Sequence, residues 1–95
     1  MGDFIEFEWD ELKNILNRDK HGIDFETAQH AFFDPNRRIM EDLDHSENEE
    51  RFFCFGFIKG VGIVTVRFTY RNGRARIIGA GIWRKGRARY EEPRS

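Results

Sequence analysis

Two kinds of hydrophobic spacing follow one another along the chain, helical in the first third and alternating in the second half. Residues 5–9 alternate three apolar side chains with two glutamates, which predicts a short strand. In residues 11–19 the apolar positions recur at helical spacing, and Asp10 before them is a good N-cap residue. Gly22 is expected to end this helix in the left-handed conformation. The apolar positions of this helix are Leu12, Ile15 and Leu16.

A second helix is expected directly after the first. Asp24 supplies its N-cap, and apolar residues at helical spacing follow in the segment FETAQHAFF. Asp34-Pro35 ends it, because the residue before a proline disfavours helical geometry. Residues 37–42 predict a strand, and the acidic segment that follows predicts a solvated loop.

The second half of the chain predicts a sheet. Alternating segments cover residues 51–58, 62–71 and 74–82, and Asn72-Gly73 is the strongest short signal for a type I′ hairpin turn. A connection of even length near residues 59–61 is expected to place the phenylalanines of the first segment on the core face with the apolar residues of the second. These residues are Phe53, Phe55, Phe57, Val64, Val66, Phe68 and Tyr70.

The predicted fold class is α+β, with a small antiparallel sheet of three or four strands and the two N-terminal helices packed on one face. Residues 1–95 are expected to form a single domain, because this length is just enough for one core and no repeat or linker interrupts it. The last basic segment, residues 83–92, has a weaker helical tendency, because Gly86 costs roughly 1 kcal/mol relative to alanine.

The predicted hairpin turn gathers arginines on one face of the sheet. It sets Arg71 opposite Arg74, and further along it sets Arg67 opposite Ile78. Because alternate side chains project to the same side, Arg76 joins them, and this face is expected to be the open one. Its other members are expected to be Cys54, Gly56, Ile63, Thr65 and Thr69.

The charge distribution favours a polyanionic partner for the second half of the chain. The net charge is only −1, yet residues 1–50 hold 15 of the 17 acidic residues and residues 51–95 hold 11 of the 16 basic ones. Guanidinium groups offer forked donors that match phosphate geometry, so the four arginines predict binding of several phosphates. The alternative is a solvated face whose arginines are neutralised by Glu41, Asp42 or the loop acids.

Composition removes several other classes of function. The three histidines lie far apart and Cys54 is the only cysteine, so neither a metal site, nor a cofactor, nor an internal disulfide is expected. A single cysteine also indicates a reducing compartment. No apolar run approaches the roughly 20 residues of a membrane span, so we expect a cytoplasmic protein without a membrane partner.

Cleavage of RNA without a metal needs only groups that this chain offers. The 2′-hydroxyl attacks the neighbouring phosphate, so the protein must supply a base, an acid and positive charge. Lys20 and His21 are candidates for the proton transfers, although cations also suit a helix C-terminus. Tyr90 is a further candidate, or else an anchor for a terminal helix. The same residues suit a binding module.

Three segments together resemble the BrnT family of bacterial type II toxins. The pattern F-x-W-D-x-x-K…N…K-H-G-I/V-x-F-x-x-A is matched by Phe7, Trp9, Asp10, Lys13, Asn17, Lys20, His21, Gly22, Ile23, Phe25 and Ala28. The pattern D-x-x-H-S-x-x-E-x-R-F is matched by Asp42, His45, Ser46, Glu49, Arg51 and Phe52. The patterns R-I-I and Y-E-E are matched by Arg76, Ile77, Ile78, Tyr90, Glu91 and Glu92. The resemblance spans about residues 5–92.

The resemblance implies a RelE-like fold and a ribonuclease toxin that inhibits translation when free. It also implies a cognate ribbon-helix-helix antitoxin, similar to BrnA, and operator DNA as a partner of the toxin–antitoxin complex only. Arg67 and Arg76 are then expected to bind phosphate and stabilise transition-state charge, with Lys20, His21 and Tyr90 transferring protons. Further substrate contacts are expected from Arg71, Arg74, Arg84 and Arg87.

One departure from the family pattern bears on activity. Many members read I-S-A-R after the fourth strand, where this chain has Gly81, and the segment GAGIWRKG is one residue shorter. If the missing arginine stabilises phosphate, cleavage is expected to be weakened or reorganised around Arg84. The rival reading is therefore a non-catalytic module that binds RNA or the antitoxin through the same arginines. A DNA-binding regulator is disfavoured, because no basic recognition helix is apparent.

Overall fold

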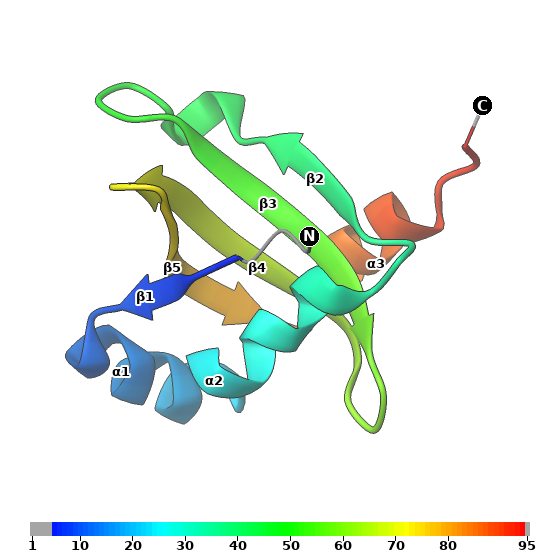
Figure 1. Cartoon of the computed structure of the whole chain (residues 1–95). Helices are drawn as coiled ribbons and strands as arrows, with labels where there is room; N and C mark the ends of the chain where they lie inside the picture. The colour runs from blue at the N-terminus through cyan, green and yellow to red at the C-terminus, as the bar shows by residue number, and fades with distance from the viewer. Residues whose placement is uncertain (1–4, 95) are drawn as a thin grey trace.

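A five-stranded sheet forms the centre of the structure, a computed structural model that describes residues 5–94 (Figure 1). The strands are β1 (Phe7–Trp9), β2 (Arg38–Glu41), β3 (Arg51–Ile58), β4 (Gly62–Arg71) and β5 (Arg74–Gly81). The helices are α1 (Glu11–His21), α2 (Phe25–Ala28), α3 (Arg84–Glu91) and the 3-10 helices η1 (Gln29–Phe33) and η2 (Leu43–His45). The α+β class is confirmed.

The strand order is β1-β5-β4-β3-β2. The four strands from β2 to β5 are antiparallel to their neighbours, as predicted. β1 instead pairs parallel to β5 at the edge of the sheet, so that Glu8 lies directly opposite Arg76. No helix within residues 5–94 is long and apolar enough to cross a membrane.

The predicted helix ends are confirmed by hydrogen bonds at their caps. The carboxylate of Asp10 accepts hydrogen bonds from the backbone N–H groups of Leu12 and Lys13, and Gly22 ends α1 with φ of 74°. The carboxylate of Asp24 accepts from the N–H of Thr27 at the start of α2. From Gln29 onward this second helix tightens into η1.

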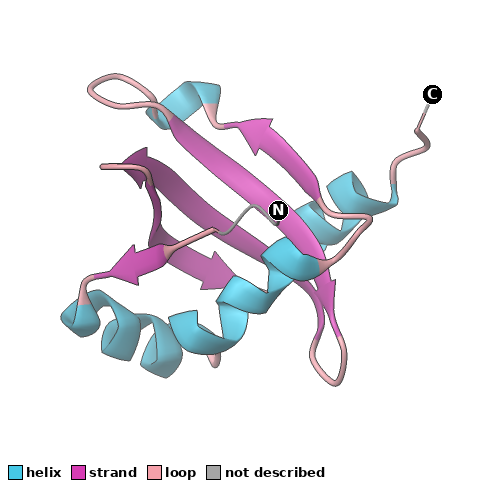
Figure 2. Ribbon diagram, viewed as in Figure 1, coloured by secondary structure: helices cyan, strands magenta, loops and turns pink. Residues whose placement is uncertain are grey.

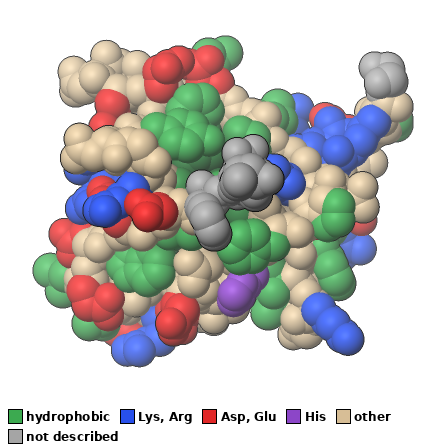
Figure 3. Space-filling view, viewed as in Figure 1, with side chains coloured by type: hydrophobic (Ala, Val, Ile, Leu, Met, Phe, Trp, Pro, Cys, Tyr) green, Lys and Arg blue, Asp and Glu red, His purple; other side chains and the backbone are tan. Residues whose placement is uncertain are grey.

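α2 and η1 cover one face of the sheet and form the core with it, in front of the sheet in the view of Figure 2. The ring of Phe32 lies edge-on to Phe68 with centroids 4.9 Å apart, and Phe7 packs edge-on to Phe32 at 5.0 Å. On this side of the molecule, acidic and basic side chains lie together beside β1, and mostly basic ones lie beside α3 (Figure 3).

The predicted pairing of β3 with β4 was wrong by one residue. The loop between Ile58 and Gly62 has three residues rather than an even number, so Cys54 lies opposite Val66. A one-residue change exchanges the faces of a strand. The core face of β3 therefore carries Phe52, Cys54, Gly56 and Ile58, and the arginines share their face with Phe53, Phe55 and Phe57.

Burial of Cys54 in the core has a chemical consequence. The desolvation of its thiol raises the pKa to about 12, so it is held as an unreactive thiol. Gly56, also predicted on the open face, lies instead under η1, where a Cβ atom would come within 2.2 Å of the carbonyl oxygen of Ala31.

The type I′ turn is confirmed, but the hairpin that it begins is not regular. Asn72 and Gly73 have φ of 55° and 76°, and Arg71 lies opposite Arg74 as predicted. Beyond Phe68 a β-bulge shifts the register, so Arg67 lies opposite Gly79 and not opposite Ile78.

α1 lies against the edge of β5 and buries little apolar surface. Its side chain Asn17 donates hydrogen bonds to the carbonyl oxygens of Ile23 and Ala80 and accepts one from the N–H of Ala80. The residues at its helically spaced apolar positions stay exposed, with Leu12 65% exposed and Leu16 57% exposed. A polar side chain, rather than an apolar stripe, thus fixes this helix.

α3 lies on the opposite face of the sheet from α2, which the sequence did not indicate. Its Gly86 is buried against Thr65 and Phe55, and a Cβ atom at Gly86 would lie 1.8 Å from Oγ1 of Thr65. The residue that weakens the helix is therefore the one that allows it to dock.

We expect Gly86→Ala to lower the free energy of unfolding by about 1–3 kcal/mol, because the added methyl group overpacks the contact with Thr65. Helix propensity alone predicts the opposite sign, a gain of about 1 kcal/mol. Urea denaturation measures the difference. The double variant Gly86→Ala/Thr65→Ala is the control and should recover most of the loss. A single Gly86→Ala variant as stable as the wild type would contradict the docking of α3.

Candidate nucleic-acid interface

α3 divides the second face of the sheet into two parts. The helix crosses this face above Phe55 and Thr65, and its Tyr90 reaches Asp34 at the end of η1. On the side of the Asn72-Gly73 turn, the face is built from arginines, because directly opposite residues of neighbouring strands share a face. We call this part the arginine face; it comprises Arg51, Arg67, Arg71, Arg74 and Arg76.

The structure adds Arg51 to the four arginines that the sequence predicted on this face. Arg51 lies opposite Thr69, and Phe53 lies opposite Arg67. The face on which Arg51 lies could not be assigned from the sequence, because that assignment depends on the length of the β3–β4 loop. The correct register alone would have placed Arg51 with the others.

Three members of the arginine face are held in ion pairs. Nε of Arg74 lies 3.1 Å from the carboxylate of Glu6, and Nη1 of Arg76 lies 3.0 Å from that of Glu8. Arg71 is paired in the same way with Glu49, at 3.1 Å. Glu8 lies in β1, Glu6 directly precedes it, and Glu49 lies in the 42–50 segment. The alternative prediction of a neutralised face is therefore met in part, by a loop acid and by two glutamates near the N-terminus, and not by Glu41 or Asp42.

Glu8 lies between two of these arginines, and its pKa reflects them. The hydrogen bond from Arg76, with the charges of Arg76 and Arg74, holds the pKa of Glu8 below its ordinary value, although desolvation opposes the shift. One carboxylate thus serves two guanidinium groups, since Nη1 of Arg74 also lies 3.6 Å from Glu8.

Arg67 differs from these three arginines. Its guanidinium makes no hydrogen bond and no ion pair with any residue in the described range 5–94. Its stem lies over Gly79, where a Cβ atom would be 4.0 Å from its Cδ atom. The half-buried Arg67 is therefore a cation on this face whose charge is available to a ligand.

Trp83 packs against Gly81, which lies two residues beyond Gly79 on β5. The indole of Trp83 covers Gly81 so closely that a Cβ atom there would lie 2.3 Å from the ring. His21 meets the same indole edge-on, with ring centroids 5.1 Å apart. His21 is one helical turn after Asn17, whose Oδ1 atom lies near Gly79, so both side chains project from α1 toward β5.

The remaining predicted residues are spread around α3. Arg84 and Arg87 border a groove with Trp83, and Arg87 forms an exposed ion pair with Glu91 at 3.2 Å. Lys20 is exposed at the end of α1 beside His21. The structure therefore brings His21, Arg84 and Arg87 together around Trp83.

Tyr90 lies at the opposite end of α3 from Trp83. Its hydroxyl group donates a hydrogen bond of 2.6 Å to Oδ2 of Asp34, and the acceptance of this bond by Asp34 raises the pKa of Tyr90. The same Oδ2 atom accepts from the N–H of Phe57, at 2.7 Å. This geometry makes Tyr90 an anchor for α3.

The acidic segment after β2 is largely exposed, as predicted, and hydrogen bonds hold it in place. Nδ1 of His45 lies 3.0 and 3.2 Å from the two carboxylate oxygens of the buried Asp42. Oγ of Ser46 donates to the carbonyl oxygen of Asp42 and accepts from the N–H of Arg51. His45 is exposed, as the sequence predicts, and the hydrogen bonds join three residues of the pattern D-x-x-H-S-x-x-E-x-R-F, Asp42, Ser46 and Arg51.

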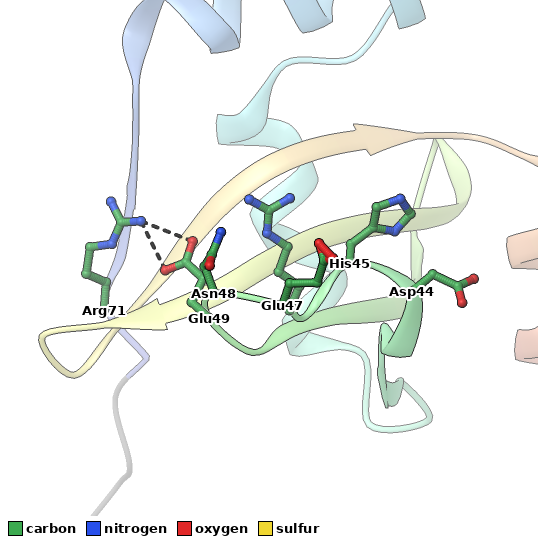
Figure 4. Close-up of a pocket in the computed structure, with 7 residues that line it drawn as sticks. Asp44, His45, Glu47, Asn48, Glu49 and Arg71 are labelled. Carbon is green, nitrogen blue, oxygen red and sulfur yellow. Dashed lines mark hydrogen bonds and ion pairs between the residues drawn. The ribbon is translucent and has the colours of Figure 1, made fainter.

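His45 borders a pocket of about 410 Å³ beside the arginine face (Figure 4). Glu49 reaches Arg71 at one end of this pocket, and His45 and Asp44 lie at the other. The lining residues are Asp44, His45, Glu47, Asn48, Glu49, Arg51 and Arg71. Three carboxylates against two guanidinium groups make this pocket unfavourable for a phosphate.

Comparison with known proteins identifies the family of this chain. The model of a family described as the ribonuclease toxin BrnT of type II toxin–antitoxin systems matches residues 9–86. The chain belongs to the BrnT family. In fold it is similar to the crystal structure of the Brucella abortus ribonuclease toxin BrnT, with a TM-score of 0.63 and 22% identity over 82% of this chain and 95% of that one. No curated protein matches.

At Gly81 the chain departs from the pattern of the BrnT family, and the structure shows what fills the space of the side chain. Where the resemblance leads one to expect an arginine, this chain has a glycine whose missing side chain is replaced by the indole of Trp83. Any side chain at position 81 would displace this ring and, with it, the contact to His21. Gly81 and Trp83 therefore belong together as one local arrangement of this BrnT chain.

We expect Glu8→Gln to strengthen polyanion binding, because it removes the carboxylate paired with Arg76 and the more distant of the two paired with Arg74, which keeps Glu6. One or two additional phosphate contacts would make the slope of log K against log salt more negative by about 0.7 to 1.4. Fluorescence anisotropy with a 2′-O-methyl oligonucleotide measures this slope. The control is Glu26→Gln on α2, which changes the net charge equally. Equal slopes for the two variants would contradict the pairing.

The Asp34 carboxylate gives a pH-dependent prediction. Burial acts to raise its pKa, but hydrogen bonds from Tyr90, Phe57 and Asn36 outweigh burial and lower it below its ordinary 3.8. The stabilisation is therefore present above pH 3.8 and is lost as the pH falls through the pKa of the folded state. We expect Asp34→Asn to cost about 2 kcal/mol at neutral pH and less below pH 4.

Urea denaturation at a series of pH values tests this expectation, with Asp44→Asn on the exposed η2 as the control. A destabilisation by Asp34→Asn that stays constant from neutral pH to pH 3 would show that the charge of Asp34 contributes nothing.

Proposed function

We propose that this member of the BrnT family is a metal-independent endoribonuclease whose cleavage of RNA inhibits translation. In the cytoplasm it would be neutralised by a cognate ribbon-helix-helix antitoxin similar to BrnA, and operator DNA would bind only to the toxin–antitoxin complex. We further propose that residues 1–95 form a single domain, a variant of the RelE-like fold. The observation that carries the proposal is the unpaired guanidinium of Arg67 on the arginine face.

Charge stabilisation is the part of the reaction that the arginine face supplies best. When the 2′-hydroxyl attacks the adjacent phosphorus, negative charge develops on the phosphate oxygens, and donors fixed in place lower the barrier. Arg67 approaches them without first leaving a carboxylate. Arg76 must exchange Glu8 for the substrate, and both side chains of this half-buried pair keep part of their surface open to solvent. Arg71 and Arg74 would bind flanking phosphates in the same way.

Proton transfer requires a base for the 2′-hydroxyl and an acid for the departing 5′-oxygen. His21 is our first candidate, because it lies on the β5 side of α1, two residues along β5 from the site of Arg67. Lys20 beside it is a second. Tyr90 already donates its proton to Asp34, so its proposed part in the reaction is the weakest.

The rival function, a non-catalytic module for RNA or antitoxin, uses the same surface. It differs in how it responds to substitution. A binding surface loses affinity gradually as each arginine is removed, because phosphate contacts contribute similarly. A catalytic site fails abruptly where transition-state charge is stabilised.

The test is incubation of purified, antitoxin-free protein with mixed RNA in EDTA. We expect cleavage by the wild type and at least an about 100-fold loss in Arg67→Ala, the size associated with one transition-state donor. Arg76→Ala should lose activity as well. The control is Arg89→Ala, an exposed α3 arginine paired with Glu92.

Two results would overturn the proposal. Full activity in both Arg67→Ala and Arg76→Ala would place the active site elsewhere. Intact RNA with folded wild-type protein, and affinity that declines evenly with each arginine removed, would establish the binding module. If the wild type cleaves RNA, the cleavage rates of His21→Ala and His45→Ala are compared. His45 is the control, because its ring is held by Asp42, and only His21→Ala is expected to lower the rate.

A further inference from the structure

A groove of about 430 Å³ lies on the far side of α3 from the arginine face. There β3 runs past its last pair with β2, at Phe55, and β4 begins before its first pair with β5, at Thr65, so the two strands pair only with each other. The groove is bordered by Phe57, Val61, Gly62, Ile63, Ile82, Trp83, Arg84 and Arg87, and we call it the hairpin groove.

Two flat aromatic side chains are exposed in the hairpin groove. Phe57 is 51% exposed and Trp83 is 37% exposed, and neither belongs to the core under α2. The backbone N–H of Phe57 is bonded to Asp34, and the indole of Trp83 is packed against Gly81. Exposed aromatic rings offer surfaces on which a nucleobase stacks.

The charge of the hairpin groove selects the kind of ligand. The ionisable residues that line it are Arg84 and Arg87, and within residues 5–94 Arg84 makes no ion pair, whereas Arg87 pairs with the exposed Glu91. The pocket beside His45 has a similar size but is lined by three carboxylates. Of these two pockets, the hairpin groove is the one that combines apolar rings with positive charge, the pairing by which proteins hold single-stranded nucleic acid.

We propose that the hairpin groove binds an unpaired base of the RNA substrate, stacked against Phe57 and Trp83, with an adjoining phosphate held by Arg84 and Arg87. This proposal rests on the proposed ribonuclease function and adds a subsite to it. Phe57 is four residues beyond Phe53 on β3, and Phe53 lies opposite Arg67. The strand rise makes this separation about 13 Å, which a short run of nucleotides spans.

The test separates the contribution of the base from that of the phosphates. Binding is measured by fluorescence anisotropy for a 2′-O-methyl hexanucleotide, which lacks the attacking hydroxyl group, and for an abasic oligonucleotide of equal charge. We expect the wild type to bind the first about tenfold more tightly, as one stacked base provides. Phe57→Ala should remove most of this tenfold difference and leave abasic binding unchanged.

Phe33→Ala is the matched control, because Phe33 is 60% exposed but lies on η1 on the other face of the sheet. It should retain the tenfold difference. Equal binding of the two oligonucleotides by the wild type would overturn the proposal. So would a Phe57→Ala variant that keeps the base dependence but loses affinity for the antitoxin, since the groove would then be a protein-docking surface.

The outcome is independent of turnover, because the 2′-O-methyl probe is not cleaved. Cleavage in EDTA without a base-dependent increment would leave the ribonuclease function standing and remove the subsite. A base-dependent increment that Phe57→Ala abolishes, in a protein that leaves RNA intact, would retain the subsite and remove the proposed turnover.

Discussion

The buried side chains of Asn17 and Asp34 form hydrogen bonds with backbone groups at the two uncovered edges of the sheet, and the arrangement of the helices depends on these bonds. β1 and β2 are short, so β5 and β3 each run on without an outer neighbour. Asn17 binds both backbone groups of Ala80 on β5, and Asp34 accepts the N–H of Phe57 on β3. A buried backbone group without a partner costs about 1–3 kcal/mol. Each side chain therefore does what a further strand residue would do, and binds a helix at the same time.

These two contacts determine where the functional groups lie. Asn17 fixes α1 on the edge of β5, and one turn later His21 meets Trp83. Asp34 receives the hydroxyl of Tyr90 and fixes the far end of α3, while Gly86 lets the middle of that helix settle onto the sheet. The aromatic and basic groups at the start of α3 are thus held by hydrogen bonds made elsewhere in the molecule.

Local signals in the sequence were sufficient for the parts of the fold that depend on neighbouring residues. The caps of α1 and α2 and the turn at Asn72-Gly73 were predicted correctly, because each is a short-range preference. The faces of β3 were assigned wrongly, since a single residue of loop length exchanges them. The pairing of Glu8 with Arg76 joins residues 68 positions apart and follows from the parallel β1–β5 register, which no local pattern encodes. The four arginines were therefore predicted, and Glu49 belongs to the loop acids of the alternative prediction, but the pairing with Glu6 and Glu8 was not predicted.

The acids resolve a conflict between stability and binding on the arginine face. Five guanidinium groups on neighbouring strands repel one another, which destabilises a sheet. Glu6, Glu8 and Glu49 relieve this repulsion in the free protein. The ion pairs of Arg71 and Arg74 are exposed. Because an exposed ion pair contributes only about 0–1 kcal/mol, the phosphates of a bound RNA can replace their carboxylates at little cost. The pair of Arg76 with Glu8 is half-buried. Arg51 and Arg67 need no such exchange, because no carboxylate in residues 5–94 is paired with either guanidinium. Of these two arginines, Arg67 lies beside Gly79, on the side of the face toward His21 and Trp83, so a phosphate that it binds comes nearest to the candidate for proton transfer.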